Sequence, residues 1–306
     1  MEMNFDVIII GGGAAGISAA LWCDDLKLTA LLLEREAELG GQLLRVFNPI
    51  KNHLGIEAEN GRELRDAFLR QIENHQFTVR LQSEIARVDL ENKSVTISSG
   101  ETFSAKAIII ATGVRRRRLD IEGEVKFKEK GIIESGKRDA TLVKNKNVCI
   151  VGGGDAAFEN ALTLAETAAS VLLVHRREDF RARSEFIEQV KNNSKIEILI
   201  ATAVRKITGG ERVEAIEFED LKTGEIFARS IEAVLIRIGV KPNTDFTPRQ
   251  IDLDASGYIK INQNCETNIE GIFAVGDAAN PIAPTVSSAV GMGATAVKAI
   301  SFKLKN

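Results

Sequence analysis

The sequence has few of the residues that mark disulfide-bonded, metal-binding or membrane proteins. Its three cysteines, at positions 23, 149 and 265, are odd in number and far apart, which fits neither a disulfide framework nor a cluster of metal ligands. No apolar run approaches the roughly 18 residues of a membrane span, and the first residues, MEMNFDVIII, lack the basic segment of a secretory signal. We expect reduced, buried thiols, no metal site, no membrane association and a cytoplasmic protein.

The sequence also lacks an excess of positive charge. Its 40 Lys and Arg residues against 43 Asp and Glu residues give a formal net charge of -3. Nucleic acids and anionic membranes are bound by proteins with a basic field, so neither partner is expected. The 306 residues, 44% of them hydrophobic, are enough to bury a sizeable core and favour two domains.

An internal repeat organises the chain. DVIIIGGGAAGISAAL begins at Asp6, and NVCIVGGGDAAFENAL begins 141 positions later at Asn147. Each copy reads as a strand, a glycine turn and a helix. The first copy has the G-x-G-x-x-G pattern at Gly11, Gly13 and Gly16, and the second has Gly152, Gly154 and Ala157. This pattern lets a backbone loop and a helix N-terminus approach a dinucleotide pyrophosphate, so we predict two dinucleotide sites.

The residues at the end of the next strand indicate which nucleotide each copy binds. Glu34 lies 23 residues after Gly11, and His175 lies 23 residues after Gly152. A carboxylate at this position accepts hydrogen bonds from ribose hydroxyls, which indicates FAD. The second copy instead has Arg176, Arg177 and Arg181, and guanidinium groups bind a 2′-phosphate, which indicates NADPH. The alternative is that these arginines only form a solvated face.

The order of these segments predicts an α/β fold with two Rossmann-like dinucleotide-binding domains. The FAD-binding domain is predicted at residues 1–114 and 245–306, and the NADP-binding domain is inserted at residues 115–244. A breaker-free stretch from Thr285 to Lys303 predicts a final helix.

Together, GGGAAG, LERE, GGQL, ATG, GGGDAA, HRREDFRAR and GIFAVGD resemble the low-molecular-weight thioredoxin reductases, of the pyridine nucleotide-disulfide oxidoreductase class, over nearly the whole chain. The resemblance implies a homodimer in which NADPH reduces FAD at its N5 atom. It also implies further nucleotide contacts, which match motif positions in this sequence: for FAD, Ala14, Ala15, Arg35, Gly41, Gln42, Asn52, Ile85, Ala111, Thr112, Gly113, Gly276 and Asp277; for NADPH, Asp155 and Ala156.

One segment departs from the resemblance. The family has a C-x-x-C-D segment before the second nucleotide strand, and this sequence has Ser135, Arg138 and Asp139 there. Serine and arginine cannot shuttle electrons, and no other C-x-x-C exists in the sequence. We therefore expect no catalytic side chain other than the flavin itself, an Arg138–Asp139 pair, and a reaction other than thioredoxin reduction.

The leading hypothesis is an NADPH-dependent flavin oxidoreductase that delivers electrons to an external acceptor, such as the acidic carriers ferredoxin or flavodoxin. It resembles the thioredoxin-reductase-type ferredoxin–NADP reductases, and this resemblance implies that Phe47 stacks on the flavin; an ordinary core position is the alternative. The run Arg115–Arg118, near Lys126, Lys128 and Lys130, is a candidate docking patch. The alternative, implied by the resemblance, is that one of these arginines helps to hold NADPH and the others are solvated. The alternatives are an NADPH oxidase or diaphorase that uses small acceptors, and a flavin-binding sensor without turnover.

Overall fold

The computed structural model describes residues 4–305. The chain divides into two compact units: unit 1 comprises residues 1–115 and 241–306, and unit 2 comprises residues 116–240. The sequence-based boundaries lie at residues 114/115 and 244/245. The chain passes between the units in β7 (Val114–Arg116) and β16 (Val240–Pro242), which pair as a two-stranded sheet.

Unit 1 is built around a seven-stranded sheet with the order β3-β2-β1-β6-β5-β4, and β17 pairs with β6. Its strands are β1 (Asn4–Ile10), β2 (Ala30–Leu33), β3 (Thr78–Arg80), β4 (Ile85–Asp89), β5 (Ser94–Ile97), β6 (Thr102–Ile110) and β17 (Ile272–Ala274). Its helices are α1 (Ala14–Asp25), α2 (Gly61–Ile72) and α5 (Val286–Lys305), with the short 3-10 helices η1 (Gly41–Arg45) and η3 (Gly276–Ala278). The final helix predicted from Thr285 corresponds to α5.

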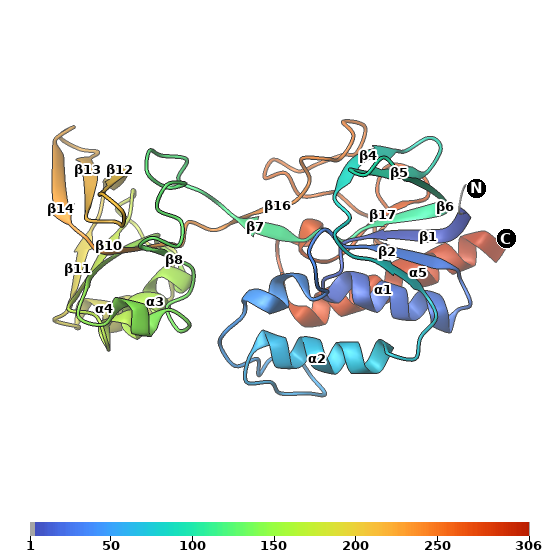
Figure 1. Ribbon diagram of the computed structural model, residues 1–306, viewed down its shortest axis with the longest axis horizontal. Helices are drawn as coiled ribbons and strands as arrows, with labels where there is room; N and C mark the ends of the chain where they lie inside the picture. The colour runs from blue at the N-terminus through green and yellow to red at the C-terminus, as the bar shows by residue number, and fades with distance from the viewer. Residues whose placement is uncertain (1–3, 306) are drawn as a thin grey trace. The chain divides into compact units, whose positions relative to one another are not determined.

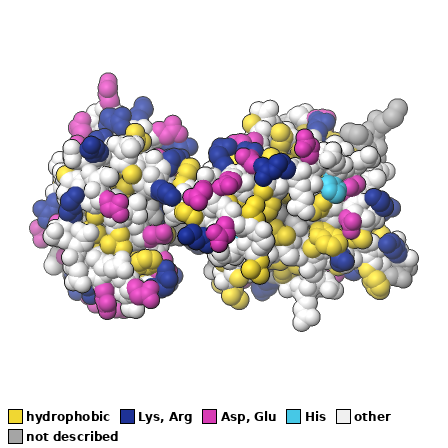
Figure 2. Space-filling view, turned by 90° about the horizontal axis from the view of Figure 1, so that it is seen from below, with side chains coloured by type: hydrophobic (Ala, Val, Ile, Leu, Met, Phe, Trp, Pro, Cys, Tyr) yellow, Lys and Arg dark blue, Asp and Glu magenta, His cyan; other side chains and the backbone are white. Residues whose placement is uncertain are grey.

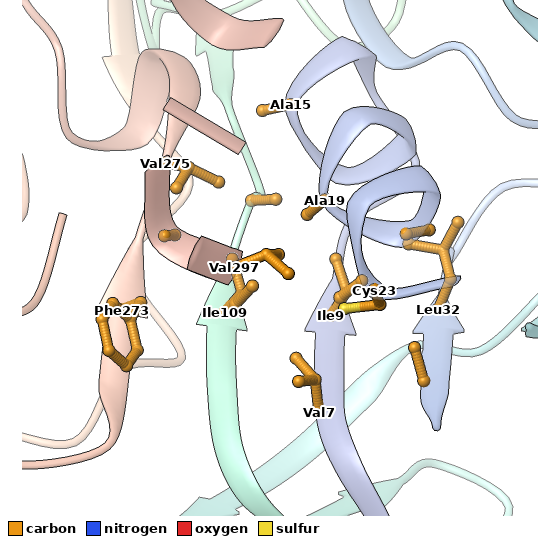
Figure 3. Close-up of a cluster of buried hydrophobic side chains, with 14 of the residues drawn as sticks. Val7, Ile9, Ala15, Ala19, Cys23, Leu32, Ile109, Phe273, Val275 and Val297 are labelled. Carbon is orange, nitrogen blue, oxygen red and sulfur yellow. The ribbon is translucent and has the colours of Figure 1, made fainter. Parts of the chain in front are cut away.

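Both faces of this sheet are covered, as the continuous apolar runs of its central strands require. Val7 and Ile9 of β1 pack against α1 and α5, which lie on the same side of the strands (Figure 1). Figure 3 shows Ala19 of α1 and Val297 of α5 in this cluster. Ile8 and Ile10 enter a second cluster on the opposite face. The alternation of β1 side chains therefore fixes the sheet between two hydrophobic layers.

Unit 2 repeats the arrangement with a five-stranded sheet of order β11-β10-β9-β15-β8, whose strand pairs are all parallel. The strands are β8 (Ile132–Ile133), β9 (Asn147–Val151), β10 (Ser170–Val174), β11 (Ile196–Leu199) and β15 (Ala233–Ile236). The remaining elements are the helices α3 (Asp155–Ala165) and α4 (Ser184–Lys191), the 3-10 helix η2 (Ala140–Val143), and an antiparallel sheet of β12 (Thr202–Thr208), β13 (Ala215–Asp220) and β14 (Ile226–Ser230).

The unit 2 sheet is also covered on two sides. Val148 and Ile150 of β9 pack with Phe158 of α3 in one cluster, while Cys149 and Val151 pack with Phe218 of β13 in another. The helices and the antiparallel sheet thus lie on opposite faces of the parallel sheet (Figure 1). Among the described helices, none is long and apolar enough to cross a bilayer.

Candidate nucleotide-binding sites

The first glycine loop joins β1 to α1 in unit 1. Gly11 has φ +112, and a Cβ on Gly16 would lie 1.9 Å from the carbonyl oxygen of Gly11, so both positions exclude larger residues. Gly13 caps α1 without a side-chain hydrogen bond, and no acidic residue lies in the first turn. The first amides of a helix have no partner within it, so this N-terminus is a suitable place for a phosphate.

Glu34 follows β2 beside this loop, and only 6% of its surface is exposed. Its carboxylate oxygens accept hydrogen bonds from the amides of Gly12 at 2.7 Å and Glu36 at 2.9 Å. A carboxylate has about four acceptor positions, so Glu34 is held in place and can still accept hydrogen bonds from a ribose. Arg35 differs, because its guanidinium is exposed and pairs with Glu36 at 3.3 Å.

Two further glycines predicted from the resemblance lie against the same loop. A Cβ on Gly41 would lie 3.0 Å from the Cα of Gly13, and a Cβ on Gly276 would lie 2.9 Å from the Cβ of Ala15. Gln42 donates a hydrogen bond from Nε2 to the carbonyl oxygen of Val114 at 2.7 Å. The structure therefore brings segments from both ends of the chain to the start of α1.

Asp277 provides a test of whether unit 1 fits FAD. This carboxyl is half-buried, and burial raises its pKa. Within the part of the chain that the structure describes, the side chain forms no hydrogen bond or ion pair. A buried polar group without a partner is costly, and the hydroxyls of a ribityl chain would supply that partner. The residues present thus fit FAD.

The ATG turn is held by a residue that the sequence analysis missed. The Thr112 hydroxyl donates to the carbonyl oxygen of Asn243 at 2.8 Å, and Asn243 Nδ2 donates to the carbonyl oxygen of Thr112 at 2.8 Å. The amide of Asn243 also donates to the carbonyl oxygen of Gly113 at 2.9 Å. The sequence signal that could have indicated this residue is the Pro242–Asn243 pair, which follows an apolar strand.

The other predicted FAD contacts differ in their surroundings. Ala111 lies against the first glycine loop, because a Cβ on Gly11 would lie 2.4 Å from its carbonyl oxygen. Asn52 is exposed, whereas Phe47 and Ile85 are partly exposed. Ile85 packs against a hydrophobic cluster of the sheet, while Phe47 is in none of the clusters found among the described residues.

The second glycine loop joins β9 to α3 in unit 2. Gly152 has φ +155, and its Cβ would lie 2.2 Å from the carbonyl oxygen of Arg237. At Gly154, which caps α3 without a side-chain hydrogen bond, a Cβ would meet nothing within 4 Å. This open space at an uncapped helix N-terminus fits a pyrophosphate.

The arginine-rich loop is tied to this glycine loop at two points. The amide of Arg181 donates to the carbonyl oxygen of Gly153 at 2.7 Å. Asp155 accepts hydrogen bonds from the amide of Arg183 at 2.7 Å and from its Nε at 3.0 Å. The Asp155 side chain therefore positions the loop, and the neighbouring Ala156 lies in the first turn of α3.

Arg176, Arg177 and Arg181 are exposed, and within the described residues their side chains form no ion pair or hydrogen bond. His175 packs beneath Gly153, whose Cβ would lie 2.3 Å from the ring. Burial lowers the pKa of His175, and the three arginine charges lower it further. Three positive charges without partners thus surround the end of β10.

The segment Ser135–Asp139 forms a closed turn in unit 2. Arg138 donates two hydrogen bonds to the Asp139 carboxylate, at 2.6 and 2.9 Å, which confirms the predicted pair. Asp139 also accepts from the amides of Glu134 at 2.9 Å and Ser135 at 3.1 Å. Burial alone would raise the pKa of Asp139, but these hydrogen bonds outweigh it and the pKa is lowered.

The predicted state of the cysteines is also confirmed. Cys23, Cys149 and Cys265 are free and buried. Burial raises the pKa of Cys23 to about 12 and that of Cys265 to about 11, and it raises the pKa of Cys149 further. Thiols with such pKa values are unreactive at neutral pH, because the thiolate is the nucleophile.

The chain matches the family described as pyridine nucleotide-disulphide oxidoreductase over residues 5–293. It belongs to that family. Thioredoxin reductase of Spironucleus barkhanus is 34% identical over 294 residues, covering 95% of each chain. A protein of Clostridium pasteurianum described as a 34.2 kDa protein in rubredoxin operon is 31% identical over 300 residues, covering 96% of each chain. The structure of Lactococcus lactis thioredoxin reductase is similar, with a TM-score of 0.85, 30% identity and 98% coverage of each chain.

These relatives establish a thioredoxin reductase-like flavoprotein with Rossmann-type sheets that uses FAD and NADPH. Bound FAD supplies the redox centre that accepts hydride from NADPH.

Proposed function

We propose that the protein transfers electrons from NADPH through FAD to an external acceptor without an internal dithiol, and that it is not a thioredoxin reductase. The turn at Ser135 carries this proposal. Its side chains are a hydroxyl, which accepts a hydrogen bond from the amide of Arg138 at 3.2 Å, and a guanidinium and a carboxylate that are bound to each other; none of these groups changes oxidation state. The described cysteines cannot replace them, because each is buried and burial raises the pKa of its thiol.

The two glycine loops would hold the nucleotides in this reaction. The start of α1 and Glu34 bind the FAD pyrophosphate and ribose, and Asp277 orients the ribityl chain. The start of α3 binds the NADPH pyrophosphate, and the three unpaired arginines of unit 2 bind the 2′-phosphate. These free arginines also argue against a flavin-binding sensor, because selective NADPH binding serves redox chemistry.

The proposed acceptor is an acidic electron-carrier protein such as ferredoxin or flavodoxin. Without a dithiol, which accepts electrons in pairs, the reduced flavin can release its electrons one at a time. One-electron carriers are therefore suitable partners. The relative described by its place in a rubredoxin operon supports the same class of acceptor and adds rubredoxin to the carriers that should be tested.

An anaerobic NADPH titration of the purified holoenzyme tests the proposal. We expect one NADPH to reduce each FAD, followed by rapid reoxidation when ferredoxin, flavodoxin or rubredoxin is added, and no turnover with thioredoxin. Uptake of four electrons per FAD, or rapid thioredoxin turnover, would show that a dithiol relay exists.

A second candidate is an oxidase or diaphorase that reduces oxygen or a quinone. It is favoured because arginines of the run that the sequence suggested as a docking patch bind groups of the protein itself. Arg115 pairs with Asp245, and Arg117 donates from Nε to the carbonyl oxygen of Val240 at 2.9 Å. On the face shown in Figure 2, basic and acidic side chains are interspersed within each unit. Adding oxygen and quinone to the reduced enzyme separates the two candidates.

We also propose a homodimer, since the resemblance to the thioredoxin reductases implies one. Light scattering after size exclusion should give twice the 33.3 kDa of one chain, and a mass of 33.3 kDa would contradict the dimer.

A further inference from the structure

The first turn of α3 carries a carboxylate that binds a neighbouring loop rather than its own helix. Asp155 is the first residue of α3, and Gly154 caps the helix without a side-chain hydrogen bond. Asp155 Oδ1 accepts from the amide of Arg183 at 2.7 Å, and Oδ2 accepts from Arg183 Nε at 3.0 Å. Among the described residues, the amides of Gly154, Asp155 and Ala156 donate no hydrogen bond. The start of α3 therefore keeps donors available for an anion.

The Arg183 guanidinium is held on two sides. Its Cζ lies 4.5 Å from the centroid of the Phe186 ring of α4, and its Nε binds Asp155. The side chains of Arg183 and Asp155 are 62% and 46% exposed, and an ion pair in contact with solvent adds little stability. The clearer consequence of the pair is electrostatic, because the guanidinium offsets the charge of a carboxylate beside the start of α3.

An uncompensated carboxylate at this position would oppose nucleotide binding. In the proposed NADPH site, the pyrophosphate binds the first amides of α3, and Asp155 lies in that same turn. Two negative groups this close repel each other, and the repulsion is only partly screened by water. The positive charge of Arg183 beside Asp155 reduces that repulsion, so the carboxylate can hold the loop without excluding the ligand.

We propose that Arg183 is a positioning residue that cancels the charge of Asp155 and so allows the second glycine loop to accept the pyrophosphate. It acts through Asp155 and not on the 2′-phosphate, which the three unpaired arginines of unit 2 bind. This inference rests on the proposed binding of NADPH at the second glycine loop. Removal of the Arg183 charge alone should weaken nucleotide binding, whereas removal of both charges should restore it.

Calorimetric titration of the oxidised holoenzyme at low ionic strength tests the inference. The two ligands are NADP⁺ and 2′-AMP, which has the 2′-phosphate but no pyrophosphate. We expect Arg183→Gln to weaken NADP⁺ binding about tenfold, the effect of one charge at about 6 Å in an effective dielectric of about 40. Binding of 2′-AMP should change less than about twofold. The tenfold difference from the wild type should shrink at about 1 M salt, where the Debye length is about 3 Å.

Asp155→Asn gives the sharper test, because it keeps an acceptor for the Arg183 amide but removes the charge. We expect this variant to bind NADP⁺ several-fold more tightly than the wild type. The double variant Arg183→Gln with Asp155→Asn should bind within about twofold of the wild type. Arg183→Lys retains the charge and should retain the affinity.

Arg229→Gln is the matched control. Arg229 is an exposed arginine of the antiparallel sheet, and its Cζ lies 5.6 Å from the centroid of a phenylalanine ring, that of Phe227. The control therefore removes a charge from similar surroundings on the face of the parallel sheet opposite to α3, and it should change the binding of neither ligand.

Equal weakening of NADP⁺ and 2′-AMP binding by Arg183→Gln would mean that Arg183 binds the 2′-phosphate. Weaker NADP⁺ binding by Asp155→Asn, or a double variant as weak as Arg183→Gln, would mean that the pair only holds the loop. An unchanged NADP⁺ affinity in Arg183→Gln would mean that the Asp155 charge does not act on the ligand. Each of these results overturns the inference while leaving the proposed function intact. Failure of the wild-type protein to bind either ligand would overturn the nucleotide assignment and the inference with it.

Discussion

Replacing Arg176, Arg177 and Arg181 together with glutamine should remove most of the preference for NADPH over NADH. A hydrogen bond to a charged group contributes about 1.5 to 3 kcal/mol. All three side chains are exposed, so solvent screening reduces the contribution of each to about 1 kcal/mol. Three such contacts amount to about 3 kcal/mol, or roughly 150-fold in kcat/KM for NADPH. The efficiency with NADH, which lacks the 2′-phosphate, should stay within about threefold of the wild type.

Anaerobic stopped-flow measurement of FAD reduction gives both efficiencies. These arginines have no partner within the described residues, so the free energy of unfolding of the variant should lie within about 0.5 kcal/mol of the wild-type value. Any large loss of stability would invalidate the comparison. Arg205→Gln serves as the control for removal of an exposed charge, because Arg205 lies on the antiparallel sheet of unit 2 and pairs with Glu219 at 3.1 Å. The reasoning fails if the triple variant loses NADH and NADPH efficiency equally, or if the wild type uses both nucleotides equally well.

Three further substitutions test other parts of the two sites. Asp277→Asn should stabilise the apoprotein against thermal unfolding at pH 7. Burial raises the folded-state pKa of Asp277, so the protein loses stability as the pH rises through that pKa and the carboxyl becomes charged. FAD titration of the same variant should show about tenfold weaker binding. Gly154→Ala fills open space, so stability should change by less than about 0.5 kcal/mol while calorimetry shows NADPH binding weakened at least about tenfold. Circular dichroism should show that Arg138→Gln moves the acid-unfolding transition to higher pH. The lowered pKa of Asp139 gives stability that is present above the unfolded value near 3.9 and is lost as the pH falls through the folded value.

Local patterns in the sequence were sufficient to predict the repeated units. The apolar run before Gly11 and the run before Gly152 each became the central strand of a parallel sheet, and each was followed by a helix that begins at a glycine cap. Adjacent residues could also be paired in advance, as with Arg138 and Asp139. In these cases the information lies within a few residues of the feature that it predicts.

Contacts between distant segments could not be predicted in this way. Arg237 and Glu134 are 103 positions apart, and only the order of β8 and β15 brings them together. Arg115 and Arg116 are consecutive in sequence, yet Arg115 binds Asp245 and Arg116 binds the carbonyl oxygen of Glu134. Successive side chains of a strand point to opposite faces, so a run of like charges in β7 does not produce one basic patch.

This separation of the arginines changes where an acidic carrier is expected to dock. Lys128 and Lys130 are exposed in unit 2, and no salt bridge to either is found among the described residues, so they are better candidates than Arg115. If they steer a carrier, turnover with ferredoxin or flavodoxin should fall steeply with salt, because exposed charges are screened within about 8 to 10 Å at physiological ionic strength. Lys128→Gln with Lys130→Gln should reduce carrier turnover several-fold at low salt and leave FAD reduction by NADPH unchanged. The control is Lys303→Gln in unit 1, where Lys303 pairs with Glu266, and it should alter neither. Carrier turnover that is independent of salt and of both lysines would remove the electrostatic argument for an acidic protein partner and favour a small acceptor.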